Sequence, residues 1–103
     1  MDYAATYNRN RGNWLYELAR DGKVSATGVR VGLLFATFFV AESREEVGPS
    51  YEWIMESAHV ANRNSVSKAI KQLESAGFLL VYRMHRYRNR YSMPFDGEKD
   101  WNR

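Results

Sequence analysis

Arginines occupy four of the eight positions between residues 83 and 90, where the density of groups able to bind an anion is unusually high. The four are Arg83, Arg86, Arg88 and Arg90, and Tyr87 lies among them. A guanidinium group forms forked hydrogen bonds to phosphate or enters a narrow minor groove. Tyr87 offers a ring to pack on a sugar and a hydroxyl to donate to phosphate. A lone surface arginine is often only solvated, but this cluster favours contact with a polyanion.

A second group of polar side chains belongs to the segment just before this cluster. Apolar residues there recur at offsets of three and four, which predicts a helix with one buried stripe. The stripe consists of Val66, Ala69, Ile70 and Leu73. The remaining positions before Glu74 are positive, amide or hydroxyl and include no acid: Arg63, Asn64, Ser65, Ser67, Lys68, Lys71 and Gln72.

Side chains of this kind suit a DNA groove. Asparagine and glutamine pair with adenine, and lysine favours guanine, at about 1–3 kcal/mol for each good contact. We therefore expect Asn64, Ser65, Lys68 and Gln72 to be the candidates for contact with base edges. The alternative for Ser65 is a hydrogen bond to the backbone near the start of the helix.

The elements expected around these two groups are a helix and then a hairpin. Asn62 is a good N-cap, and Gly77 is a good stop because glycine tolerates the left-handed conformation. Residues 78–84 alternate between two faces, starting with Phe78, and a second strand is expected at residues 90–93. The arginines therefore fall around the tip of the predicted hairpin.

Two helices are expected earlier in the chain. Residues 13–20 place Trp14 and Leu18 at helical spacing, and this short helix either packs onto the core or forms a dimer contact. Ser25 is the expected N-cap of the next helix, with residues 30–44 as its body. Apolar side chains lie on nearly every side of that helix, which predicts a central place in the core. They are Val29, Leu33, Leu34, Ala36, Phe38, Phe39 and Ala41.

A short edge strand and a short helix are expected before Asn62. Val47 marks the strand, and Ser50 is the expected N-cap of the helix. The side chains expected to face inward from this helix are Trp53, Ile54 and Ala58. Residues 59–61 then form the turn into the polar helix.

Composition and charge set the broad class. The chain has 103 residues, 45% hydrophobic and 26% charged, as in one ordinary globular domain. Residues 1–52 hold six basic and seven acidic side chains, whereas residues 53–103 hold nine and five. The positive charge thus lies with the predicted helix and hairpin. The absence of cysteine excludes disulfides and fits a reducing cytoplasm. The apolar run at 31–41 is shorter than the roughly 20 residues of a membrane span, and no secretory signal is evident.

An enzyme is not expected. His59 and His85 are the only histidines, and their spacing does not suit a metal site. No glycine-rich phosphate loop or nucleophile elbow occurs. The acidic cluster Glu42, Glu45 and Glu46 is better explained as a solvated helix end. We therefore predict no catalytic residue, no metal, no cofactor and no small-molecule ligand.

Several short motifs carry a family resemblance. They are PSYE at 49–52, RNSV at 63–66, LE and AG within 73–77, and NRY at 89–91. With them, roughly residues 23–93 resemble a bacterial winged helix-turn-helix family of plasmid and phage replication proteins and small transcriptional regulators. The resemblance implies a recognition helix at 62–76, a wing at 83–90, and further DNA contacts from Ser50 and Tyr51. The chain departs from the family at His59 and Ala61, where a glycine often stands.

The expected fold is α+β and mainly α: a winged helix-turn-helix with an extra N-terminal helix and a C-terminal β-hairpin wing. The expected divisions are an N-terminal extension (1–22), a DNA-binding domain (23–94) and a polar tail (95–103). The expected function is sequence-specific binding of double-stranded DNA by a homodimer in the bacterial cytoplasm, associated with the nucleoid or a plasmid. It would act as a transcriptional regulator, such as a repressor, of a plasmid, phage or other mobile element. Two alternatives stay open: a replication or partition accessory protein that binds origin or centromere repeats, and a winged-helix module that binds protein.

Overall fold

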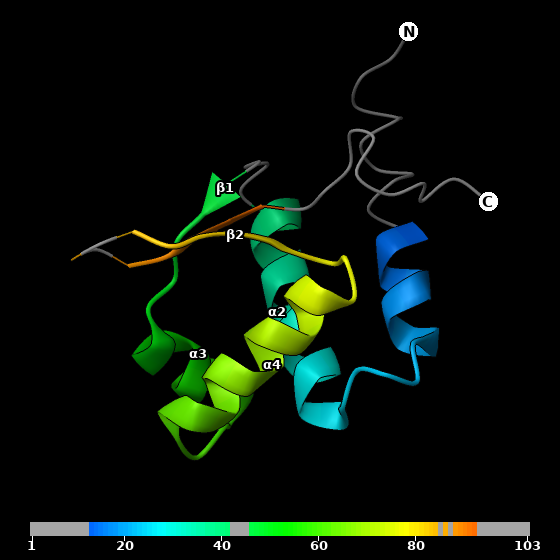
Figure 1. Cartoon of the computed structure of the whole chain (residues 1–103), viewed down its shortest axis with the longest axis horizontal. Coiled ribbons are helices and arrows are strands. Elements are labelled where there is room, and N and C mark those ends of the chain that lie inside the picture. Colours follow the sequence, from blue (N-terminus) through cyan, green and yellow to red (C-terminus); the bar gives the residue numbers. More distant parts are fainter. Residues whose placement is uncertain (1–12, 42–45, 85, 87, 93–103) are drawn as a thin grey trace, which may run out of the picture.

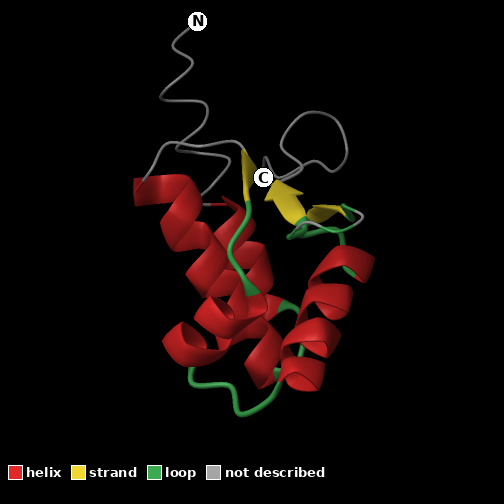
Figure 2. Ribbon diagram, turned by 90° about the vertical axis from the view of Figure 1, so that its left-hand side faces the viewer, coloured by secondary structure: helices red, strands yellow, loops and turns green. Residues whose placement is uncertain are grey.

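The computed structural model describes residues 13–41, 46–84, 86 and 88–92. A helix at residues 13–20, called here the N-terminal helix, is followed by the elements shown in Figure 1. These are α2 (Ala26–Ala41), β1 (Glu46–Val47), α3 (Tyr51–Ala58), α4 (Arg63–Ser75), β2 (Leu80–Tyr82) and β3 (Arg90–Ser92). Within this part of the chain the fold is α+β and mainly helical. The helices pack together, and the small sheet lies at one end of them (Figures 1 and 2).

Some sequence predictions fall outside the described residues. They concern Tyr87, His85, the acidic pair Glu42 and Glu45, and everything from residue 93 onward, including the expected tail. Among the described residues, no helix has the length and apolar character needed to cross a membrane.

Helix α2 lies at the centre of the core, as predicted, and buries one face of its apolar surface. The helix begins at Ala26, four residues before its predicted body, and the Ser25 hydroxyl caps it by accepting from the Gly28 N–H at 3.1 Å. Val31 and Phe35 are its most buried large side chains, although neither was singled out from the sequence. Leu33 is 47% exposed, so the helix does not bury apolar side chains on every side. Arg30 and Thr37 lie on the same face as Leu33 and are exposed as well.

The N-terminal helix belongs to the same core. Trp14 and Leu18 are fully buried. The indole Nε1 of Trp14 donates to the backbone oxygen of Phe78 at 2.8 Å, and the two rings meet edge to face at 5.7 Å. Leu18 packs where Gly32 lets α2 approach, since a Cβ on Gly32 would lie only 2.6 Å from Leu18 Cδ2. Of the two roles considered for this helix, packing onto the core is therefore established.

Helix α3 begins at its predicted N-cap. The Ser50 hydroxyl accepts from the Trp53 N–H at 3.1 Å, and Ile54 and Ala58 are buried as expected. Trp53 is 40% exposed, with its ring 4.8 Å from that of Phe38. The prediction that Trp53 faces the core was therefore wrong: the indole lies over the edge of the core.

The turn between α3 and α4 uses a residue other than glycine in the left-handed region. His59 has φ 54° and ψ 48°. Its N–H and that of Val60 both donate to the Met55 carbonyl, which satisfies the end of α3. Arg30 of α2 adds a third donor there, from Nη1 to the Ala58 carbonyl at 3.3 Å. The cationic side chain also suits the negative end of the helix dipole.

The three strands form an antiparallel sheet in the order β1-β3-β2. The predicted edge strand at Val47 is confirmed, and Val47 and Val81 flank Tyr91 on the central strand. Tyr91 is fully buried, with its ring 4.7 Å from that of Phe35. This contact seats the sheet on α2.

Strand β2 starts at Leu80, two residues after the predicted start of alternation. Gly77 has φ 85°, and the N–H groups of Gly77 and Phe78 bond back to the carbonyls of Glu74 and Leu73 at 3.1 and 2.8 Å. This is the Schellman pattern that terminates a helix. Phe78 and its neighbour Leu79 are therefore both buried in the turn out of α4, and the period-two pattern does not apply to them.

Candidate nucleic-acid interface

Helix α4 presents the polar face predicted from its sequence. Asn62 caps it, with Oδ1 accepting from the Ser65 N–H at 2.9 Å. The entire predicted stripe is buried: Val66, Ala69, Ile70 and Leu73. On the remaining surface the side chains of Arg63, Asn64, Lys68 and Lys71 are exposed, whereas those of Ser65, Ser67 and Gln72 are half-buried. The helix thus offers amide, hydroxyl and ammonium groups to solvent along its length.

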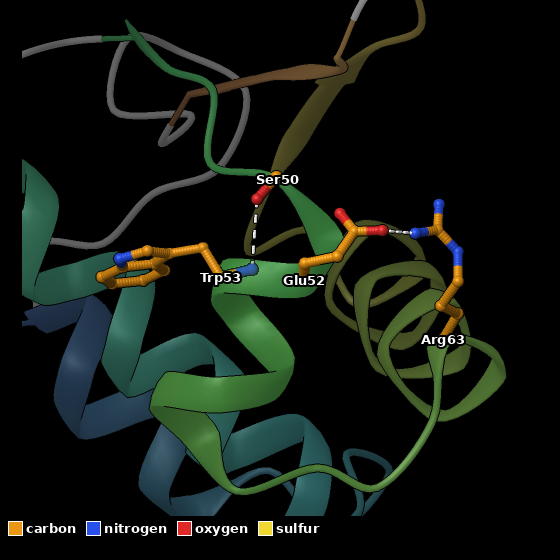
Figure 3. Close-up of polar contacts among 4 residues, drawn as sticks. All are labelled: Ser50, Glu52, Trp53 and Arg63. Atoms are coloured by element: carbon orange, nitrogen blue, oxygen red, sulfur yellow. Dashed lines mark hydrogen bonds and ion pairs between the residues drawn. The ribbon is translucent and has the colours of Figure 1, made fainter.

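The starts of α3 and α4 are joined by an ion pair. Arg63 Nη1 donates to Glu52 Oε1 (Figure 3), and the Arg63 guanidinium also lies 5.1 Å from the centre of the Tyr51 ring. Both charged side chains are more than half exposed, so this pair contributes little to stability. Arg63, Ser50 and Tyr51 are therefore brought close together, but the Ser50 hydroxyl is occupied as a cap.

Gln72 is bonded to the segment before α2. Its Oε1 accepts from the Ser25 hydroxyl at 2.8 Å and from the Ser25 N–H at 3.2 Å. Because a backbone N–H only donates, the chemistry fixes which end of the amide faces Ser25. The predicted role of Gln72 as a base reader therefore competes with a tertiary contact between residues 47 positions apart.

Arg83 is paired within the protein. Its Nη1 and Nη2 donate to Glu74 Oε2 and Oε1 at 2.9 and 2.8 Å. These hydrogen bonds hold the pKa of the Glu74 carboxyl below its ordinary value and raise the pKa of Arg83. The sequence placed Arg83 with the arginines of the hairpin and Glu74 away from them. The structure instead joins the two across the turn at Gly77.

The rest of the arginine cluster divides into exposed and held side chains. Arg86, which has φ 70°, and Arg88 are exposed near the hairpin tip. Arg90 is half-buried and runs over Gly48, where an added Cβ would lie 2.8 Å from Arg90 Nη1. Among the described residues, Arg86 and Arg88 form no ion pair. Within the described part of the arginine cluster, these two guanidinium groups are the ones most available to an external anion.

Lys23 is a candidate site residue that sequence reasoning missed. A hollow of about 310 Å³ lies beside the C-terminal half of α4. It is lined by Lys23, Lys68, Lys71, Gln72, Ser75 and Ala76. Lys23 is more than forty positions away from the others in sequence, so no local pattern could have associated it with them.

The described residues contain no group of three or more His, Asp and Glu side chains suited to hold a metal ion. His59 is exposed in its turn and lies apart from the polar face of α4. The chemistry assembled here is hydrogen-bond donation and positive charge.

Comparisons with protein-family models, with curated proteins and with solved structures found no match for this chain. The interpretation of the interface therefore depends on the residues themselves. Two surfaces carry it: the polar face of α4, and the hairpin formed by β2 and β3.

Proposed function

We propose that this chain is a winged helix-turn-helix protein that binds double-stranded DNA in a sequence-specific manner. The order α2-β1-α3-α4-β2-β3, with the sheet order β1-β3-β2, supports the winged-helix assignment. In this proposal α4 is the recognition helix and the hairpin of β2 and β3 is the wing. The observation that carries the proposal is that α4 buries its whole apolar stripe and turns outward a polar face with no acid before Glu74, while Arg86 and Arg88 are exposed near the tip of the hairpin.

The dimensions of α4 suit a major groove. Its 13 residues span about 20 Å at 1.5 Å per residue, compared with a groove about 12 Å wide. In this proposal the N-terminal half lies in the groove, where exposed Asn64 reaches base edges, and Lys68, at the middle of the helix, contacts the DNA where the helix leaves the bases. Arg86 and Arg88 contact phosphates or enter the adjacent minor groove, because guanidinium groups suit both.

Within this proposal the role that fits best is that of a small transcriptional regulator of a plasmid, phage or other mobile element, acting as a homodimer. A single domain of this kind reads few base pairs, and paired half-sites add both affinity and specificity. Selection of bound sequences from a random duplex pool would distinguish the roles. A palindrome with half-sites about one helical turn apart supports the dimeric regulator, whereas tandem repeats support a replication or partition protein.

The direct test is fluorescence anisotropy with a labelled duplex across a salt series. We expect wild-type affinity to fall steeply with salt and the double substitution Lys68→Ala with Arg88→Ala to weaken binding. Arg20→Ala is the matched control, because Arg20 bonds to Tyr16 on the N-terminal helix. If the double variant Lys68→Ala with Arg88→Ala binds as tightly as wild type, the proposed interface is contradicted. If the affinity of wild type for duplex does not depend on salt, a protein-binding module is favoured instead.

A further inference from the structure

Three ammonium groups gather at the hollow beside α4. Lys68 and Lys71 come from the helix and Lys23 from the loop before α2, and all three are exposed. Their polar companions in the lining are Gln72 and Ser75. Among the described residues, no acidic side chain lines the hollow, so the charged side chains that border it are all positive.

The two acidic side chains closest in sequence to these lysines, Asp21 and Glu74, have hydrogen-bond partners within the protein. Asp21 Oδ1 accepts from the Lys23 backbone N–H at 2.8 Å, which makes the tight turn that leads into α2. Glu74 is held by both terminal nitrogens of Arg83. Neither carboxylate is part of the lining, and the net positive charge of the residues that line the hollow favours an anion from outside the chain.

The loop that carries Lys23 is fixed against α4. Gln72 Oε1 accepts two hydrogen bonds from Ser25, two residues after Lys23. With Oε1 directed at Ser25, the Gln72 Nε2 group remains as a donor on the other side of the amide. Within the described residues Nε2 donates to no acceptor. The backbone that carries Lys23 is thus held beside α4 before any ligand arrives, which lowers the entropic cost of binding.

We infer that this hollow binds a backbone phosphate of duplex DNA at the rim of the groove entered by α4. The inference rests on the proposed function and adds Lys23 as a phosphate ligand from outside the helix and hairpin. Since α4 is longer than the groove is wide, its C-terminal part, with Lys71 and Ser75, emerges over the sugar–phosphate backbone. In Figure 1 the strands β2 and β3 run to the left of the picture, and the start of α2 lies to the right of α4.

The test compares Lys23→Gln with Arg20→Gln in anisotropy titrations on a mixed-sequence duplex between about 50 and about 200 mM salt. Both changes remove one exposed positive charge from neighbouring parts of the chain, but only Lys23 lines the hollow. For Lys23→Gln we expect the slope of log K against log salt to decrease by about 0.9, with affinity five- to tenfold lower at about 0.1 M salt. Arg20→Gln should match wild type, and thermal melts of both variants should match it as well.

The possible results distinguish failure of the phosphate site from failure of DNA binding itself. If wild type binds duplex with steep salt dependence and Lys23→Gln keeps the full slope, the phosphate site is wrong while DNA binding stands. If Lys23→Gln and Arg20→Gln lose affinity equally, the effect is one of general charge and the site is again overturned. If wild type does not bind duplex at all, both the proposed function and the phosphate site are contradicted.

Discussion

Arg83 and Glu74 form a two-pronged ion pair that links the end of β2 to the last turn of α4, with N–O distances of 2.9 and 2.8 Å. The planar guanidinium meets the carboxylate in the bidentate geometry that both groups favour. The pair spans the turn at Gly77, where the chain leaves the helix. It therefore links the start of the hairpin to the end of α4, and both terminal nitrogens of Arg83 have a partner within the protein.

This assignment predicts different behaviour for two arginines that are alike in sequence. Arg88→Gln should lower the slope of log K against log salt for duplex DNA by about 0.9, because one phosphate contact is lost. Arg83→Gln should leave that slope unchanged and instead reduce affinity at all salt concentrations, since the hairpin is no longer held. The same salt-series titration checks both. An equal loss of slope in the two variants would show that Arg83 leaves Glu74 to bind phosphate.

Because the Tyr91 side chain is buried, we expect the protein to lose stability at alkaline pH. Burial raises the pKa of Tyr91 to about 12, while the neighbouring Asn89 side chain acts in the opposite direction. The unfolded chain releases this proton near pH 10 and the folded chain only near pH 12. The folded state therefore holds more protons in that window, and its stability falls as pH rises through it. The full loss from this one group is about 3 kcal/mol.

Denaturant unfolding of wild type and Tyr91→Phe between about pH 9 and about pH 12 measures this difference. We expect the variant to be within about 1 kcal/mol of wild type at neutral pH and to lose less stability above pH 10. Tyr82→Phe is the control, because Tyr82 is 45% exposed. Parallel pH curves for wild type and Tyr91→Phe would contradict the buried, neutral phenol.

Because His59 adopts the left-handed backbone conformation, we expect a glycine at this position to stabilise the turn between α3 and α4. A side chain in the left-handed region costs about 1–2 kcal/mol, which glycine avoids. The greater freedom of glycine in the unfolded chain offsets about 0.5–1 kcal/mol of this. His59→Gly should therefore raise the free energy of unfolding by about 0.5–1 kcal/mol, as measured by urea denaturation. His59→Ala keeps the Cβ and should give no gain. Equal stabilisation by both changes would mean that the backbone strain is not the cause.

Because Trp14 is fully buried, we expect the N-terminal helix to be needed for a stable core. Trp14→Phe retains an aromatic ring but removes the donor to the Phe78 carbonyl, so we expect a loss of about 1–3 kcal/mol. Tyr16→Phe on the same helix is the control, because Tyr16 is 56% exposed and surface changes have effects within about 0.5 kcal/mol. Thermal and urea unfolding of the two variants provide the comparison. Indistinguishable stabilities would argue against a structural role for the helix.

The sequence predicted well wherever a local pattern determines structure. The stripe from Val66 to Leu73 is amphipathic, so its period identifies the buried side, and Ser50 and Asn62 are caps because their side chains bond to nearby N–H groups. Prediction was incomplete for α2, where the apolar run hides an outer face: Leu33 is exposed together with Arg30 and Thr37, which lie three positions before it and four after it. Prediction failed at Trp53, which covers Phe38 without being buried.

The candidate site was predictable only in part, for the same reason. The exposed positions of α4 follow from its period, but the partners of its polar side chains come from tertiary structure. Gln72 meets Ser25, and Arg83 meets Glu74, through turns whose geometry no local pattern specifies. Lys23 joins the lysines of α4 by the same route. Residue type alone could not show which polar groups remain available to a partner.

The hydrogen bond from Trp14 to Phe78 also has a consequence for synthesis on the ribosome. Its two ends are 64 positions apart, and elongation proceeds at about 5–20 residues per second. Trp14 and Leu18 therefore wait about 3 to 13 seconds after leaving the ribosome before the carbonyl and ring that complete their burial emerge. During that interval the helix at residues 13–20 presents an indole and a leucine to solvent, and a chaperone that recognises exposed apolar segments has time to bind.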